Sequence, residues 1–147
     1  MTPRPPRTLP TRRRVFVFDC EALSKASRGD ETVALFVRAA SRNGIHVVTS
    51  ALTVLEAWDP RSARQGKAWD WTLSRIEVVH TDDRIFTEAR DLLTHAGLHG
   101  HKYAIDAVLA AVALRFAQPR TDVSVLTSDT DDLRKLLAGH RIRIEPV

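Results

Sequence analysis

The sequence has few of the features that mark secreted, membrane-spanning or phosphate-loop proteins. Its 147 residues include one cysteine, Cys20, so no disulfide forms within the chain and a reducing compartment is its natural home. No apolar run approaches the roughly 20 residues of a transmembrane helix, and the basic start lacks the apolar segment of a secretory signal. No glycine-rich phosphate loop is present. We therefore expect a cytoplasmic protein with no membrane partner.

Charge and composition are those of an ordinary soluble domain, except at the start of the chain. The 22 Lys and Arg residues outnumber the 18 Asp and Glu residues, a balance that permits attraction to a polyanion without requiring it. Residues 1–12 contain four prolines and three arginines, a composition that excludes a helix or a central strand. We predict a basic, proline-rich mobile arm over residues 1–12 and a single domain over residues 13–147.

The remainder of the chain alternates between two kinds of segment. Short β-branched runs are separated by longer segments whose apolar residues recur at helical spacing. The predicted strands cover residues 15–18, 45–49, 76–80, 123–126 and 142–145. Because these strands are nearly continuous apolar runs, they predict a buried parallel sheet with helices on both faces. The expected fold is therefore α/β, with three layers (α/β/α) and a central, mostly parallel sheet of about five strands.

Helix signals lie in the intervening segments. Asp30 and Thr81 are candidate N-caps, and Gly97 suits a helix end. The Asp59-Pro60 pair separates two expected helices, because the residue before proline avoids the helical conformation. Further helices are expected over residues 51–58, 61–74, 102–117 and 130–138, and the helix over 102–117 is apolar nearly all round, which indicates burial.

Four carboxylates interrupt or close the apolar runs. They are Asp19, Glu56, Asp106 and Asp129. An ionised carboxylate inside an apolar interior loses several kcal/mol of hydration unless a cation or hydrogen-bond donors replace the water. Asp106 is the most informative of the four, because it is the only charged residue between Tyr103 and Leu114. The set indicates that the fold gathers these groups around a shared cation.

The expected topology allows the four carboxylates to meet. Asp19 and Asp129 follow the first and fourth predicted strands, and the carboxyl ends of parallel strands share one edge of the sheet. If the first strand is central and the fourth is its neighbour, these two residues lie at the switch in strand order. Asp19 and Asp129 can alternatively be helix caps, and Glu56 can be a surface residue. Carboxylates without cysteine or a convincing histidine set suit Mg²⁺ or Mn²⁺ and phosphodiester hydrolysis better than zinc chemistry.

Residues 14–147 resemble the PIN domain, and in particular the VapC-type toxins of bacterial toxin–antitoxin pairs. Four short acidic motifs carry the resemblance, in the order found in that family. They are Phe18-Asp19, Leu52-Thr53-Val54-Leu55-Glu56, Ile105-Asp106-Ala107 and the segment 126–133 that contains Asp129 and Asp132. The resemblance implies a three-layer α/β/α fold and an endoribonuclease that depends on Mg²⁺ or Mn²⁺. The alternative is a non-catalytic RNA- or protein-binding module on the same fold.

The resemblance also assigns roles to the acidic residues. It implies that Asp19 and Asp106 are the main metal ligands, that Glu56 completes the catalytic site and helps to position water, and that Asp129 adds a further carboxylate. Asp132 matches an additional acidic residue of some members, and the choice between Asp129 and Asp132 as the one that faces the metal stays open. The implied partners are an RNA substrate, a cognate antitoxin and a second copy in a homodimer. The implied antitoxin region holds three tryptophans that are equally compatible with core packing: Trp58, Trp69 and Trp71.

Overall fold

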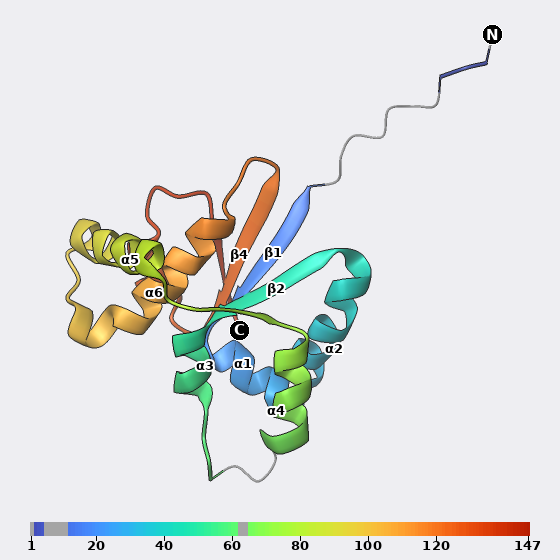
Figure 1. Ribbon diagram of the computed structural model, residues 1–147, viewed down its shortest axis with the longest axis horizontal. Helices are drawn as coiled ribbons and strands as arrows, with labels where there is room; N and C mark the ends of the chain where they lie inside the picture. The colour runs from blue at the N-terminus through green and yellow to red at the C-terminus, as the bar shows by residue number, and fades with distance from the viewer. Residues whose placement is uncertain (1, 5–11, 62–64) are drawn as a thin grey trace.

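Five parallel strands form the centre of the protein (Figure 1). The computed structural model describes residues 2–4, 12–61 and 65–147, so the arm predicted over residues 1–12 lies mostly outside the described residues. The strands are β1 (Arg13–Phe18), β2 (Ile45–Ser50), β3 (Glu77–Val79), β4 (Thr121–Thr127) and β5 (Arg143–Pro146). Their order is β3-β2-β1-β4-β5, which places β1 at the centre with β4 beside it. All four strand pairings are parallel.

The central strand β1 separates two hydrophobic cores. Val15 and Val17 pack on one face of the sheet, whereas Phe16 and Phe18 pack on the other, because successive side chains of a strand point to opposite faces. All four side chains are buried. A strand that is apolar on both faces belongs in the middle of a covered sheet, and this confirms the predicted three-layer α/β/α architecture.

Helices cover both faces of the sheet (Figure 1). One layer contains α5 (Asp83–Ala96), α6 (Gly100–Phe116) and α7 (Thr130–Leu136), which pack against Val15 and Val17. The other contains α1 (Cys20–Ser27), α2 (Glu31–Ala40) and α4 (Gln65–Ser74), and a short 3-10 helix (Ser41–Asn43) follows α2. The helix α3 (Ala51–Ala57) comes directly after β2 and contacts both α1 and α6. It therefore lies at the edge of the sheet where the strands end.

Helix starts follow the predicted capping chemistry with one correction. Asp30 caps α2 by accepting a hydrogen bond from the Val33 backbone N–H at 3.1 Å. The predicted cap at Thr81 is wrong, because Asp82 accepts the bond from the Ile85 N–H at 2.9 Å instead. The Asp82 carboxylate also pairs with Arg115, a contact that an uncharged threonine hydroxyl does not offer. Gly97 ends α5 with φ of 67°, as predicted.

The helix α6 contains a continuous buried stretch. Every residue from Ala107 to Ala113 is buried, as the continuous apolar run predicts. Among the described residues, no helix has both the length and the apolarity needed to cross a membrane. The buried stretch of α6 packs in the core of one layer, and Asp106 enters that layer at its start.

Candidate metal centre

The ends of β1 and β4 fix the position of Asp19. The Asp19 backbone N–H donates to the Leu126 carbonyl at 3.1 Å, so the residue continues the pairing of the two strands. Its side chain is buried, with 6% of the residue exposed. One carboxylate oxygen accepts from the Ala22 N–H and the other from the Ser128 N–H, both at 2.9 Å. Asp19 is thus the N-cap of α1 and also lies at the switch in strand order, so its two predicted roles are compatible in position.

Asp129 follows β4 but does not cap α7 with its side chain. Its backbone N–H donates to the Thr127 hydroxyl oxygen at 2.9 Å, and the Thr127 side chain is fully buried. Asp129 therefore occupies the N-cap position of α7, but the predicted side-chain cap is wrong, because its carboxylate accepts no hydrogen bond from the start of the helix.

Three carboxylates converge closely enough to share one ion. Asp106, Asp129 and Asp132 each offer an oxygen, and these oxygens lie within 4.8 Å of one another. Asp106 comes from α6, whereas Asp129 precedes α7 and Asp132 lies in its first turn. Asp129 and Asp132, the two alternatives left open by the sequence, both belong to this group.

The electrostatics of Asp106 show how strongly the acids interact. Burial is the largest cause that raises its pKa from 3.8 to about 6, and the charges of four neighbouring carboxylates add to the effect. In decreasing order, these neighbours are Asp129, Glu56, Asp132 and Asp19. All five acidic residues singled out in the sequence therefore act on one region at the carboxyl edge of the sheet.

Glu56 borders this region from α3. The helix begins at Ser50, whose hydroxyl oxygen accepts from the Thr53 N–H at 3.0 Å. Although the residue is solvent-exposed, partial shielding from water raises the pKa of the Glu56 carboxyl, and the charge of Asp19 raises it further. A hydrogen bond with the Cys20 thiol partly offsets this rise. Glu56 therefore takes up a proton more readily than an isolated glutamate does.

The donor set fits a hard divalent cation. Among the described residues, the group that gathers within ion-binding distance contains only carboxylates. Burial and the charges of Glu56 and Asp19 raise the pKa of the nearby Cys20 thiol to about 11, so this thiol stays protonated and is a poor ligand. Carboxylate oxygens suit Mg²⁺ and Mn²⁺, and a cation here relieves the repulsion that raises the pKa of Asp106.

The geometry divides the predicted residues into two sets. Asp106, Asp129 and Asp132 form the close group, whereas Asp19 and Glu56 adjoin it and interact through their charges. Sequence reasoning did not find the Ser128 backbone N–H that holds Asp19. Backbone donors leave no signal in residue identity, so only the predicted meeting of β1 and β4 pointed to such a contact.

The three tryptophans have different environments. Trp69 is buried in the core with 6% of the residue exposed, whereas Trp58 is 47% exposed. Their rings lie 5.5 Å apart, centroid to centroid. Trp71 is partly buried and lies against the guanidinium groups of Arg38 and Arg75. The core interpretation therefore holds for Trp69, and Trp58 remains available at the surface beside α3.

Comparisons with known proteins place this geometry in context. The sequence model of the PIN domain matches residues 16–137. No curated protein matches the chain significantly. Among solved structures, the fold is similar to a chain of the VapBC2 complex from Rickettsia felis, whose crystal structure holds a DNA fragment from their promoter. That match has a TM-score of 0.65 at 13% identity and covers 90% of this chain and 98% of the other. At this identity the likeness concerns the fold alone.

Proposed function

Because this chain belongs to the PIN domain family, we propose that it is an endoribonuclease that hydrolyses RNA phosphodiester bonds with Mg²⁺ or Mn²⁺. PIN domains are generally nucleases. The observation that carries the proposal is the convergence of three carboxylate oxygens, from Asp106, Asp129 and Asp132, within 4.8 Å. Such a group attracts a divalent cation and repels other anions unless that cation is bound.

We assign the acidic residues different roles according to their positions. Asp106, Asp129 and Asp132 are the proposed ligands, and Asp19 is a ligand or an orienting group at the same edge. The two backbone N–H groups that hold Asp19 fix its orientation, and a carboxylate has about four lone-pair sites, which leaves others for a cation. When bound, the cation supplies charge neutralisation at the scissile phosphate and activates water for in-line attack.

Glu56 is the proposed general base. Its pKa is raised by partial burial and by Asp19, and a carboxylate whose pKa is nearer the working pH accepts a proton more effectively. It is solvent-exposed at the rim of the acidic group, so water and substrate reach it. Glu56 thereby positions the attacking water and receives its proton.

We further propose that the protein is the toxin of a toxin–antitoxin pair, acts in the cytoplasm and forms a homodimer. The order of the acidic motifs and the fold shared with a chain of a VapBC complex support this assignment. On α3 and the residue that follows it, Leu55 is 70% exposed and Trp58 is 47% exposed. Large apolar side chains in water next to Glu56 favour a protein partner over this rim, and the proposed antitoxin would cover the substrate entrance there.

Cleavage of RNA by purified protein tests the enzymatic proposal. With Mn²⁺ present, the wild-type chain is expected to cut single-stranded RNA, and chelation of the metal is expected to stop the reaction. The double variant Asp19→Asn, Asp106→Asn keeps side-chain size while removing two charges, and its rate is expected to fall at least about 100-fold. Undiminished cleavage by that variant would remove these residues from the site.

A second candidate is a non-catalytic RNA- or protein-binding module on the PIN fold. The observation that favours it is the arginine-rich edge of the sheet opposite the carboxylates, which is described below. For such a module, RNA is expected to be bound but chemically unchanged after incubation with Mn²⁺. Gel electrophoresis of the recovered RNA therefore distinguishes the two candidates.

A further inference from the structure

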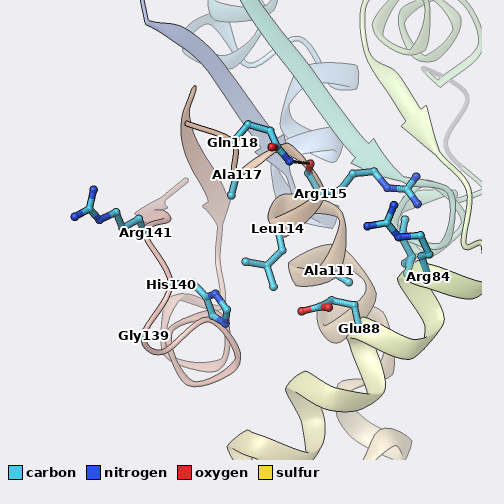
Figure 2. A pocket seen from close by; sticks show the side chains of 11 residues that line it. Arg84, Glu88, Ala111, Leu114, Arg115, Ala117, Gln118, Gly139, His140 and Arg141 are labelled. Carbon is cyan, nitrogen blue, oxygen red and sulfur yellow. Dashed lines mark hydrogen bonds between the residues drawn. The ribbon is translucent and has the colours of Figure 1, made fainter. Parts of the chain in front are cut away.

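A hollow that contains none of the acidic group lies near the amino ends of the strands, and we call it the second hollow. It has a volume of about 560 Å³ and is enclosed by the start of α5, the end of α6 and the loop that leads into β5. Its ionisable lining residues come from all three segments (Figure 2): Arg84 and Glu88, Arg115, and His140 with Arg141. None of these belongs to the proposed metal centre.

The helix α6 carries both sites on opposite sides. Asp106 and Arg115 are nine residues apart, which corresponds to about 13 Å along a helix and a half-turn around it. Because the carboxyl end of α6 leads into β4, Arg115 lies near the amino ends of the strands. Asp106, in contrast, reaches the carboxyl ends. A ligand that enters the second hollow therefore approaches α6 from the side opposite to the acidic group.

Positive charge dominates the second hollow. Figure 2 shows the Arg84 and Arg115 side chains converging from two helices at one end of it. Asp82, next to the hollow, forms an ion pair with Arg115 and also feels the charge of Arg84. Glu88 is the only acidic residue that lines this hollow within the described part of the chain. The local charge is therefore positive even after the ion pair is counted.

The positive surface continues past the hollow. A smaller neighbouring hollow of about 280 Å³ shares His140 and Arg141 with it and adds Arg143 at the start of β5. Arg141 and Arg143 are exposed and form no ion pair with any described residue. Asp122, which also lines the smaller hollow, pairs with Arg12. We use the name basic edge for Arg84, Arg115, His140, Arg141 and Arg143.

The chemistry of the basic edge matches a phosphodiester chain better than a single anion. Guanidinium groups bind phosphate through paired N–H donors, and here they extend across two adjoining hollows rather than enclosing one point. The larger hollow also has an apolar floor from Ile85, Ala111 and Leu114, which suits the face of a nucleobase. Glu88 adds an acceptor for a hydroxyl or amino group. A chain with repeating phosphates satisfies more of these groups at once than a mononucleotide does.

We propose that the basic edge binds the phosphodiester backbone of a nucleic-acid strand, at a site separate from the carboxylate group. Binding at this second site requires neither a metal ion nor cleavage, so it can be tested independently of the proposed nuclease activity. Its consequence for a nuclease is that part of the RNA is held away from the bond that is cut.

The test measures strand binding with cleavage disabled. The full chain carrying Asp106→Asn is titrated, in the presence of a chelator, into fluorescent single-stranded RNA, with anisotropy as the readout. The test variant adds Arg84→Gln, Arg141→Gln and Arg143→Gln. The matched control adds Arg42→Gln, Lys67→Gln and Arg90→Gln, which removes the same charge from exposed basic residues outside the basic edge that form no ion pair with any described residue. Circular dichroism of all three proteins confirms that they are folded.

We expect the test variant to bind at least tenfold more weakly at low salt, while the control variant changes less than threefold. The slope of log affinity against log salt is expected to fall by about 2 for three lost phosphate contacts to a single strand. Equal weakening of the two variants would show that only net charge matters, and unchanged binding by both would remove the basic edge from strand binding. Either result overturns the proposal.

Two further arms identify the ligand. Single-stranded DNA of the same sequence separates recognition of the backbone alone from recognition that includes the ribose hydroxyl. Adenosine monophosphate is added as a competitor, and displacement of the strand at equal concentrations of competitor and strand would overturn the strand proposal in favour of a mononucleotide pocket. Cleavage by the unmodified protein is measured separately, so failure of the nuclease proposal leaves this result interpretable.

Discussion

The two edges of one parallel sheet carry opposite charge, and they carry it in different ways. At the carboxyl edge, Asp19 is buried and Asp106 is half-buried, and five acids act on one region. At the amino edge, the arginines of the basic edge are exposed and spread over two hollows. Exposed charges are screened by water and cost little, whereas burial, together with the charges of the neighbouring acids, raises the pKa of Asp106 to about 6.

The two edges are supported to different degrees by the surrounding backbone. The carboxyl edge is preorganised by backbone contacts, since the N–H groups of Ala22 and Ser128 hold Asp19. Its fixed carboxylates repel one another unless a cation is bound. The amino edge has little such support beyond the ion pair of Arg115 with Asp82. We therefore expect changes at the carboxyl edge to have large effects on activity and stability, and changes at the amino edge to alter binding alone.

The largest expected effect follows from Asp106→Asn. This change removes the charge at the centre of the acidic group, so cleavage is expected to fall at least about 100-fold. In thermal unfolding, Mn²⁺ at about 100 times its dissociation constant is expected to stabilise the wild type by about 2.7 kcal/mol, and the variant by much less. A variant that Mn²⁺ stabilises as strongly as the wild type would separate Asp106 from the metal.

A smaller effect separates the two roles of Asp19. Asp19→Ala loses the cap of α1 and the bond from Ser128, and its free energy of unfolding is expected to fall by about 2 kcal/mol. Asp19→Asn keeps an oxygen for the Ala22 N–H and is expected to lose less than half as much. Urea unfolding of both metal-free variants measures the difference. Equal losses would mean that the cap contributes nothing to stability.

The pH dependence of stability distinguishes the crowded edge from the exposed one. The folded-state pKa of Asp106 is about 6, above its ordinary value of 3.8, so the folded protein binds more protons between these values. Without metal, stability is therefore expected to rise as the pH falls from 7.5 toward 5, and to fall again as the pH rises through 6. Asp106→Asn removes this contribution, and saturating Mn²⁺ in the wild type opposes it. Parallel pH profiles for wild type and variant, measured by urea unfolding, would contradict the raised pKa.

The smallest expected effect is on the amino edge. Arg141→Gln and Arg143→Gln remove exposed charges without ion pairs among the described residues, so together they are expected to change the free energy of unfolding by less than about 0.5 kcal/mol. The melting temperature measures this. A large loss of stability would mean that these arginines support the fold, and the contrast between the two edges would disappear.

Much of the carboxyl edge was predictable because its residues follow strands. The continuous apolar runs of β1 and β4 identify central parallel strands, and a parallel sheet collects the residues after them at one edge. Asp19 and Asp129 were therefore located from sequence, and the buried run around Asp106 was equally clear. The expected cap by the Asp129 side chain is not formed, although the residue stands at the N-cap position of α7, and this detail depends on the exact conformation of the turn.

The amino edge was not predictable in the same way. Its arginines come from helix ends, a loop and the start of β5. They are separated by up to 59 positions, between Arg84 and Arg143, and no motif connects them. Isolated arginines are ordinary surface residues, so only the packing of α5 against α6 brings Arg84 and Arg115 together. The shift of the α5 cap from Thr81 to Asp82 has the same origin, since Asp82 pairs with Arg115 across that packing.

The central claim is that the carboxylates at the end of the sheet form a divalent cation site. A crystal structure of the protein soaked with Mn²⁺ at pH 7.5, with anomalous differences measured for manganese, tests it most directly. We predict an anomalous peak between Asp106, Asp129 and Asp132, beside Asp19, and its loss in Asp106→Asn. Crystals with no peak there at saturating Mn²⁺, or a peak that persists unchanged in the variant, would contradict the claim.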